Sequence, residues 1–376
     1  IWKGTNTLEN CSITENKAES PKYAYGGGVY IYKNTTLLGT MNITGNTAKV
    51  GSDSSDSNMY FYNDYTIALN DGNGKTLSTD SQIGITTKDA PTSSTPVKFA
   101  TGASKDEMVY CFTSDKGYII YKEGTNLYVA VAPSELYQSD NKFYLDAGKT
   151  KLTNIKTMAE AVKIATNIHM LSGYTASSDE TVEVPSGKNV TVSRYSTFTN
   201  DAMIRANGGN LTVKATDTTS SITFDGQNVE TTVKYADGGI IHVAGTEGTS
   251  LTLTGADNSG TKTINFVNSF VKGPSAGGAI RNNGTATLTN CNISNNKASP
   301  TNEGGAIAGG VSNFGTLTME SCLVSGNSTT GNMSGGIYAG SNAIKSTIKN
   351  CQVTNNSSKL YGGGIFLSGG GSDNSG

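Results

Sequence analysis

The residues of this chain that could do chemistry are few, and its five cysteines are the first to consider. Cys291, Cys322 and Cys351 recur at intervals of 31 and 29 residues, whereas a zinc or redox site needs thiols in close pairs such as C-x-x-C. We therefore predict no metal or cofactor here. Two alternatives stay open: buried thiols acting as small apolar side chains, which we favour, and a disulfide between Cys291 and Cys322, whose parallel Cβ vectors make its torsion awkward. Cys111 falls outside this spacing.

Acid–base chemistry has little support in the sequence. Enzymes that cleave polysaccharides need clustered carboxylates with a cation nearby. Only two isolated acidic pairs occur, at 106–107 and 179–180, and we interpret both as solvated loop charges because neither has an acidic partner about 30 residues away. His242 lies in an apolar run and is predicted to be a core or groove residue. The three arginines fall beside neither acidic pair; they are Arg194, Arg205 and Arg281. We therefore predict no catalytic residue and no enzymatic activity.

The cysteines mark a phrase that the chain repeats, Cys/Met-x-Ile/Val-Ser/Thr-x-Asn, about every 30 residues. A weaker copy lies at 264–269. Such a period predicts stacked supersecondary units, because one short unit cannot bury its apolar face alone. The first letters of the five copies are Cys11, Met41, Cys291, Cys322 and Cys351, and the last letters are Asn16, Asn46, Asn296, Asn327 and Asn356.

A second repeated word combines two or three glycines with a short apolar run. It is followed by a polar turn and by alternating stretches such as 286–289, which are strand and turn signals without helical period. Both words together predict an all-β parallel β-helix with coils of about 30 residues. The Cys/Met positions would point inward as one row, and each terminal Asn would bond the neighbouring coil. The glycine words lie at 26–30, 277–280, 304–307, 335–338 and 362–366.

Four segments follow from this reading. Residues 1–50 and 171–376 are predicted to be β-helix coils, and 51–152 either a small β domain or, as we favour, a continued stack with a β-rich closing element. Residues 153–170 are predicted to be a helix that caps the second stack, with Thr157 and Glu160 as a capping box and His169 at its end. Residues 110–133 look like a hairpin around turns at 115–117 and 123–126.

The composition of the chain limits its expected location and its possible binding partners. The chain is 35% hydrophobic and 15% charged with 46 glycines, which is typical of extracellular surface fibres rather than cytosolic enzymes. Its net charge of −2 argues against nucleic acid as a partner. No apolar stretch reaches the 18 or so residues of a membrane span. Tyrosine-rich stretches at 23–32 and 59–65 could stack on glycans or pack as an external ladder.

The Gly-Gly-Ala-Ile words, the phrase Asn-Phe-Val-Asn at 265–268 and the coil ending Asn-Asn-Lys-Ala resemble polymorphic outer membrane protein repeats. The stretches 159–165 and 184–192 are similar to the start of right-handed, pectin-lyase-like β-helices in adhesin-like proteins. This resemblance implies a right-handed β-helix, secretion, surface display and adhesion. It favours a structural repeat of an extracellular fibre or adhesin-like protein. The alternative is a carbohydrate-binding or polysaccharide-degrading β-helix protein.

Both ends of the sequence fall in mid-repeat. Placing the C-terminal stretch before the N-terminal one completes a coil, in which 36 residues would separate Cys351 from Cys11. We therefore expect copies of the chain to follow one another head to tail. They would be either covalently joined or docked as separate chains, and a contact of this kind that does not close produces a filament.

Overall fold

The structure is a computed structural model that describes residues 6–232, 238–273, 277–301, 308–340 and 343–368. It divides into unit 1, residues 1–133 and 142–156, and unit 2, residues 134–141 and 157–376, and each unit is considered by itself. The fold is an all-β solenoid of about 11 turns with coils of about 31 residues, so the predicted fold class is confirmed. The expected junction between the two ends of the chain involves residues 1–5 and 369–376, which lie outside the described residues.

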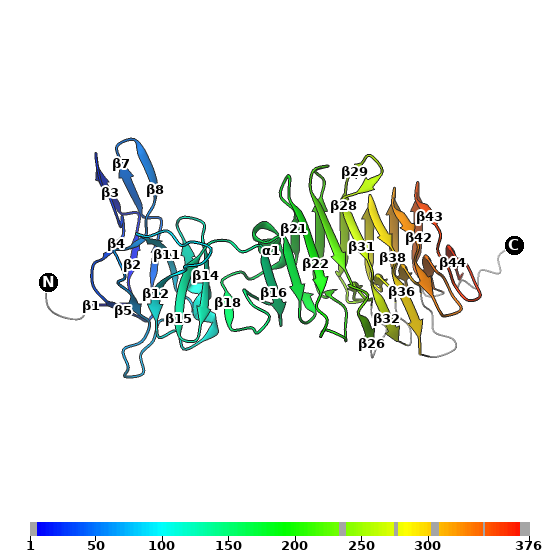
Figure 1. The fold of residues 1–376 in the computed structure, drawn as a ribbon, viewed down its shortest axis with the longest axis horizontal. Coiled ribbons are helices and arrows are strands. Elements are labelled where there is room, and N and C mark those ends of the chain that lie inside the picture. The colour runs from blue at the N-terminus through cyan, green and yellow to red at the C-terminus, as the bar shows by residue number, and fades with distance from the viewer. Residues whose placement is uncertain (1–5, 233–237, 274–276, 302–307, 341–342, 369–376) are drawn as a thin grey trace. The chain divides into compact units, whose positions relative to one another are not determined.

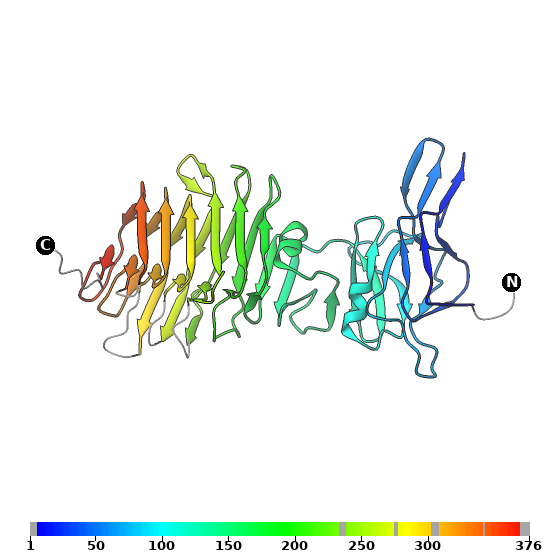
Figure 2. The same cartoon turned by 180° about the vertical axis from the view of Figure 1, so that it is seen from behind.

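Unit 2 is a stack of parallel strands in which each coil contributes one strand to each of several sheets (Figures 1 and 2). The glycine word begins the seven-stranded sheet, the alternating stretch forms the six-stranded sheet, and the Cys phrase forms a third sheet. A four-stranded sheet follows the Asn turn.

The seven-stranded sheet runs β20 (Tyr174–Ala176), β23 (Ile204–Ala206), β27 (Ile241–Val243), β33 (Ile280–Asn282), β37 (Val311–Asn313), β41 (Ile337–Ala339) and β44 (Ile365–Leu367). The six-stranded sheet runs β21 (Glu180–Glu183), β24 (Asn210–Ala215), β28 (Ser250–Gly255), β34 (Thr285–Thr289), β38 (Thr316–Glu320) and β42 (Lys345–Lys349). The sheet of the Cys phrase runs, within unit 2, β16 (Glu135–Ser139), β19 (Asn167–Met170), β22 (Asn189–Arg194), β25 (Ser221–Asp225), β31 (Ile264–Val267), β35 (Cys291–Ser294), β39 (Leu323–Ser325) and β43 (Gln352–Thr354). The four-stranded sheet is β26 (Glu230–Thr232), β32 (Phe270–Gly273), β36 (Lys297–Pro300) and β40 (Ser328–Thr329), and a short hairpin consists of β29 (Asp257–Asn258) and β30 (Thr261–Lys262).

The core of unit 2 is built from rows of like side chains. Phe266 lies in register with Ile293, and Val324 continues the same row. All three are fully buried, because alternate residues of each strand face inward and equivalent positions repeat from coil to coil. Phe224 stacks on Phe266 with ring centroids 5.0 Å apart and planes 11° from parallel.

Unit 1 contains parallel coils and an antiparallel closing sheet. Its parallel strands are β1 (Asn6–Glu9), β5 (Thr35–Leu38), β10 (Ile67–Ala68) and β12 (Val97–Thr101); β2 (Ser12–Thr14), β6 (Asn42–Thr44), β11 (Gln82–Thr87), β9 (Met59–Phe61) and β4 (Val29–Ile31), with β13 (Phe112–Ser114) on β11; and β3 (Lys17–Ser20) on β7 (Thr47–Val50). Strand β8 (Asp53–Asp56) is antiparallel to β7. The closing sheet contains β14 (Ile119–Glu123), β15 (Asn126–Ala130), β17 (Lys142–Tyr144) and β18 (Lys151–Thr153), and a 3-10 helix, η1, spans Asp106–Cys111. Residues 51–133 and 142–152 therefore continue the coils and then turn antiparallel, whereas β16 belongs to the parallel sheet of unit 2.

The capping helix is shorter than predicted. Helix α1 spans Met158–Ile164 rather than 153–170, and Thr157 Oγ1 caps it by accepting the Glu160 N–H at 3.2 Å. The helix ends at Ala165, whose backbone is extended, because the next residues pair as strand β19 with β16 and β22. His169 is therefore a strand residue and not the end of a helix, and the coils begin before residue 171. Within unit 2 the helix lies beside β21, the first strand of the six-stranded sheet (Figure 1).

A glycine word that the sequence analysis did not single out, at 308–311, is in register with the word at 277–280. The predicted word at 304–307 lies outside the described residues. The residues that stack on Gly277 and Gly278 are Ala308 and Gly309, with the Gly278 N–H donating to the Ala308 carbonyl at 2.7 Å. The sequence offers two Gly-Gly pairs five residues apart, and the pairing of Ile280 with Val311 selects the second.

Candidate functional site

The terminal asparagines of the Cys phrase form a hydrogen-bonded ladder with one direction. Asn327 Oδ1 accepts the Asn296 backbone N–H at 3.0 Å, and Asn327 Nδ2 donates back to the Ile293 carbonyl at 2.8 Å. Asn356 Oδ1 accepts the Asn327 N–H at 2.9 Å in the same way. Each coil therefore donates a backbone N–H forward to the asparagine of the following coil.

Unit 1 repeats this arrangement. Asn46 Oδ1 accepts the Asn16 N–H at 2.9 Å, and Asn46 Nδ2 donates to the Ile13 carbonyl at 2.7 Å. The ladder continues through Asn58 and ends at Asp115, whose carboxylate accepts the Asn58 N–H at 2.8 Å. The sequence pattern missed Asn58 and Asp115 because both lie outside the repeated phrase.

The sulfur row runs beside the asparagine ladder. Cys291, Cys322 and Met41 are buried, whereas Cys11 and Cys351 are half-buried. The Cys322 N–H lies 3.4 Å from Cys351 Sγ, and the Cys11 N–H lies 3.4 Å from Met41 Sδ. All five cysteines are free thiols, so no disulfide joins Cys291 to Cys322.

Burial decides the chemistry of the Cys291 and Cys111 thiols. It raises the pKa of Cys291 well above its ordinary value and the pKa of Cys111 to about 11, because a thiolate is poorly solvated in an apolar interior. These two side chains are therefore protonated near neutral pH and act as apolar core residues.

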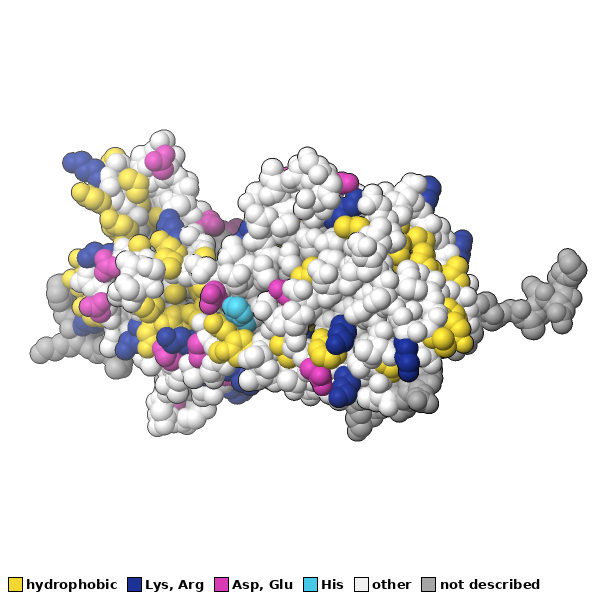
Figure 3. Space-filling model, turned by 45° about the vertical axis from the view of Figure 1, so that its right-hand side comes forward, with side chains coloured by type: hydrophobic (Ala, Val, Ile, Leu, Met, Phe, Trp, Pro, Cys, Tyr) yellow, Lys and Arg dark blue, Asp and Glu magenta, His cyan; other side chains and the backbone are white. Residues whose placement is uncertain are grey.

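The last described coil of unit 2 leaves inward-facing apolar side chains open. Ile365 and Leu367 on β44 are 37% and 65% exposed, although the equivalent Ile337 one coil earlier is fully buried. Figure 3 shows apolar side chains gathered at the end of unit 2 that its last strands form. In unit 1, Leu8 and Ile13 of the first described coil are likewise only half-buried. The two coils expose the same kind of surface.

Tyrosines gather on the outer face of β4 and β9 in unit 1. Tyr30 stacks on Tyr60 with centroids 5.5 Å apart, and Tyr32 stacks on Tyr62 at 5.2 Å. Tyr30 and Tyr32 remain 42% and 51% exposed, and Lys88 Nζ lies 4.5 Å from the Tyr62 ring centroid. We call Tyr25, Tyr30, Tyr32, Tyr60 and Tyr62 the tyrosine face.

A basic row on the seven-stranded sheet was not recognised from the sequence. Arg205, His242 and Arg281 occupy consecutive coils in direct register. His242 Nδ1 lies 3.2 Å from an Arg205 guanidinium nitrogen, and Arg205 also pairs with Asp201. A shared offset could have revealed the row, since each residue follows the first isoleucine of its strand. Arg205 borders a pocket of about 240 Å³ that also contains Asp201.

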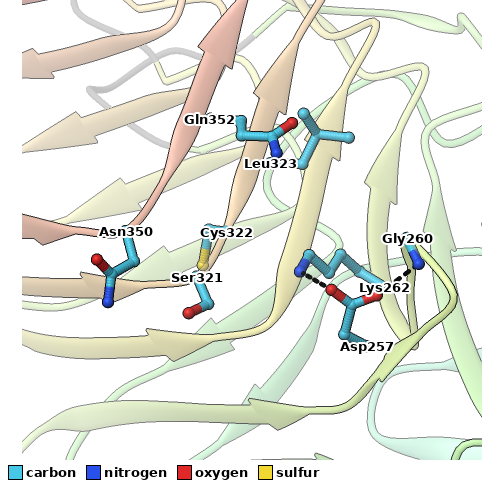
Figure 4. Close-up of a pocket in the computed structure, with 8 residues that line it drawn as sticks. All are labelled: Asp257, Gly260, Lys262, Ser321, Cys322, Leu323, Asn350 and Gln352. Atoms are coloured by element: carbon cyan, nitrogen blue, oxygen red, sulfur yellow. Dashed lines mark hydrogen bonds and ion pairs between the residues drawn. The ribbon is translucent and has the colours of Figure 1, made fainter.

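A second pocket of about 310 Å³ lies between the β29–β30 hairpin and the strands of the Cys phrase (Figure 4). Among the described residues that line it, Asp257 is the only one with a carboxylate, which accepts hydrogen bonds from Lys262 Nζ at 2.7 Å and from the Gly260 N–H at 2.8 Å. These bonds lower the pKa of Asp257, so the group is ionised at neutral pH and is no proton donor.

The two acidic pairs found in the sequence have structural partners. Asp106 bridges Lys122 and Lys142, each at 3.2 Å; burial would raise its pKa, but the two lysines outweigh this effect and lower it. Glu180 accepts the Tyr174 hydroxyl at 2.7 Å and the Ala159 N–H at 2.9 Å, which ties it to helix α1.

Among the described residues, no group of three or more His, Cys, Asp or Glu side chains could hold a metal ion. In this part of the chain, no helix has the length and apolar character needed to cross a membrane. Comparisons with protein-family models, curated proteins and solved structures found no match.

Proposed function

We propose that this chain is a structural repeat of an extracellular, adhesin-like surface fibre, in which copies stack end to end. The observation that carries the proposal is the one-directional asparagine ladder, which occurs in both units. The last described coil of unit 2 also exposes apolar side chains. In this role the solenoid does not catalyse a reaction. Its function is to hold surface residues at a regular spacing.

The resemblance to polymorphic outer membrane protein repeats supports surface display, and the low charge content fits that setting. Free thiols at buried positions fit equally well, because they serve as core side chains and need no oxidising environment for stability. A structural role in place of a catalytic one is supported by the pairing of Asp106, Glu180 and Asp257 with neighbouring groups.

The first test compares the purified chain before and after denaturation. We expect electron micrographs of the native protein to show filaments, and a denaturing gel to show whether the mass falls to the 39.1 kDa of one chain. If filaments give a band at 39.1 kDa on the denaturing gel, separate chains are docked in them. If the band stays far heavier than 39.1 kDa after denaturation, the copies are covalently joined. Compact monomers at every concentration would contradict the proposal.

The tyrosine face supports a second candidate function, the binding of a neutral glycan. Aromatic rings pack against the CH faces of sugars, and none of the hydroxyls of Tyr25, Tyr30 and Tyr32 has a hydrogen-bond partner among the described residues. Tyr32→Ala should weaken binding to immobilised neutral glycans at least about tenfold, since it removes one stacking ring. Tyr128→Ala is the control, because its ring stacks on Tyr121 in the closing sheet. Equal binding by both variants would exclude this role.

A further inference from the structure

The last described coil of unit 2 and the first described coil of unit 1 each have a side that no described strand covers, and these two sides match row by row. The coils being compared are β42 to β44 in unit 2 and β1 to β4 in unit 1. We propose that a second copy of the chain docks its β1–β4 surface on this end, in one defined register. The proposal rests on the stacking function above and specifies its interface.

The asparagine ladder gives the first match. No described residue accepts a hydrogen bond from the Asn356 backbone N–H, although Asn327 and Asn296 each donate theirs to the following coil. In unit 1, Asn16 Oδ1 accepts from no described residue, although Asn46 Oδ1 accepts from Asn16. Asn356 and Asn16 are therefore the donor and the acceptor of one missing rung.

The sulfur row gives the second match in the same register. The backbone N–H of each Cys-phrase residue points to the sulfur of the next coil, as Cys322 does to Cys351 and Cys11 does to Met41. Continuing this pattern places Cys351 against Cys11 of the second copy. It also places Val353 on Ile13, so two half-buried apolar side chains cover each other.

Charge gives the third match. Lys349 is in register with Glu320 of the preceding coil, and their charged atoms lie 3.7 Å apart. Lys349 and Glu9 both stand two positions before the cysteine of their phrase. The proposed register therefore places the Glu9 carboxylate over Lys349 and continues an alternation of charge along the row. Opposite charges on adjacent strands are favourable, whereas like charges would oppose docking.

The glycine word gives the fourth match and comes from a different sheet. Residues 360–366 read Leu-Tyr-Gly-Gly-Gly-Ile-Phe and residues 24–30 read Ala-Tyr-Gly-Gly-Gly-Val-Tyr. The first glycine of each triplet has positive φ, 44° at Gly362 and 59° at Gly26. Tyr361 and Phe366 lie 5.6 Å apart at 41°, and Tyr25 and Tyr30 lie 6.5 Å apart at 48°.

Strand β4 is the edge of its sheet, with β9 as its only described partner, and β44 has only β41. Pairing β44 with β4 of a second copy places Leu367 on Ile31 and Phe366 on Tyr30. The rings of Tyr338, Phe366, Tyr30 and Tyr60 would then form one aromatic row, since Tyr338 already stacks on Phe366 at 5.7 Å and 5°. The coil at the junction is composite: its glycine strand comes from one copy and its remaining strands from the next.

Thiol cross-linking tests this register directly. Cys111, Cys291 and Cys322 are at most 2% exposed, so Cys11 and Cys351 are the reactive thiols of the described chain. A short thiol-to-thiol cross-linker added to the 376-residue protein during assembly should produce multimers joined by a Cys11–Cys351 peptide, identified by mass spectrometry. Cys11→Ser and Cys351→Ser should each abolish the cross-link, because each removes one of the two thiols that it joins.

Leu367→Asp provides the second arm. It should raise the concentration needed for half-assembly more than about tenfold, because the junction buries a charge, and should leave the monomer's unfolding temperature unchanged. Val50→Asp is the matched control, since Val50 is 37% exposed on a strand that has partners on both sides. Filaments whose cross-links join Cys11 to Cys11, or filaments insensitive to Leu367→Asp, would overturn the register alone. Chains that remain monomeric would contradict the stacking function as well.

Discussion

Asn327→Ala is expected to destabilise unit 2 by about 3 kcal/mol. The side chain is fully buried, and its Oδ1 accepts both the backbone N–H and the Nδ2 of Asn296, each at 3.0 Å. Its Nδ2 donates to the Ile293 carbonyl. Alanine would leave these groups without partners in a dry interior, where each unsatisfied group costs about 1–3 kcal/mol. Urea unfolding at equilibrium, followed through the transition of unit 2, measures the loss.

Asn16→Ala is the matched control for that experiment. Asn16 occupies the same position of the phrase, but its side chain is exposed and donates only to the Thr14 carbonyl and Asn46 Oδ1. At concentrations where the chain is monomeric, we expect a change below about 0.5 kcal/mol in the unfolding of unit 1, as for other surface substitutions. Equal losses for both variants would show that the ladder contributes little beyond local turn geometry.

Gly278→Ala is expected to cost at least about 3 kcal/mol, because the coils approach each other too closely there for a methyl group. A Cβ on Gly278 would lie 1.7 Å from the carbonyl oxygen of Gly309. That atom belongs to the backbone of the next coil, so relief requires separating paired strands of the seven-stranded sheet. The temperature midpoint of unfolding, measured by circular dichroism, should fall by several degrees.

Gly245→Ala distinguishes steric crowding from a general effect of adding a side chain. A Cβ at Gly245 would meet no atom closer than the Asn283 carbonyl oxygen at 3.4 Å, and its backbone does not have positive φ. This variant should unfold within about 1 kcal/mol of the original protein. If both variants unfold alike, close coil contact does not explain the glycine words.

Much of the architecture could be predicted because each repeat stacks on copies of itself. Cys322, Val324 and Asn327 have the same neighbours as Cys291, Ile293 and Asn296, so their letters recur with the spacing of the coil. Where the neighbours differ, the pattern failed. The predicted helix, 153–170, included residues that pair as strand β19 in the structure. Helical periodicity in the sequence does not show where strand pairing ends a helix.

The candidate site was predictable in part. The asparagine and sulfur rows follow from the phrase, whereas Asn58 and Asp115 join the ladder through space and share no local pattern with it. The basic row of Arg205, His242 and Arg281 was overlooked because coils of different length shift equivalent residues out of any constant period. The shared position after an isoleucine is the one local signal, and the strand register shows that the three residues are neighbours.

The sequence by itself determined that the chain is a β-solenoid and which residues form its inner rows. Stacked coils require similar residue types at equivalent positions of each coil. Only the tertiary structure decided that Ala308 and Gly309 continue the glycine row, and where the ladder leaves a donor at Asn356 and an acceptor at Asn16. The physical reason is that composition and period describe one coil, whereas direction and register are properties of two coils hydrogen-bonded to each other.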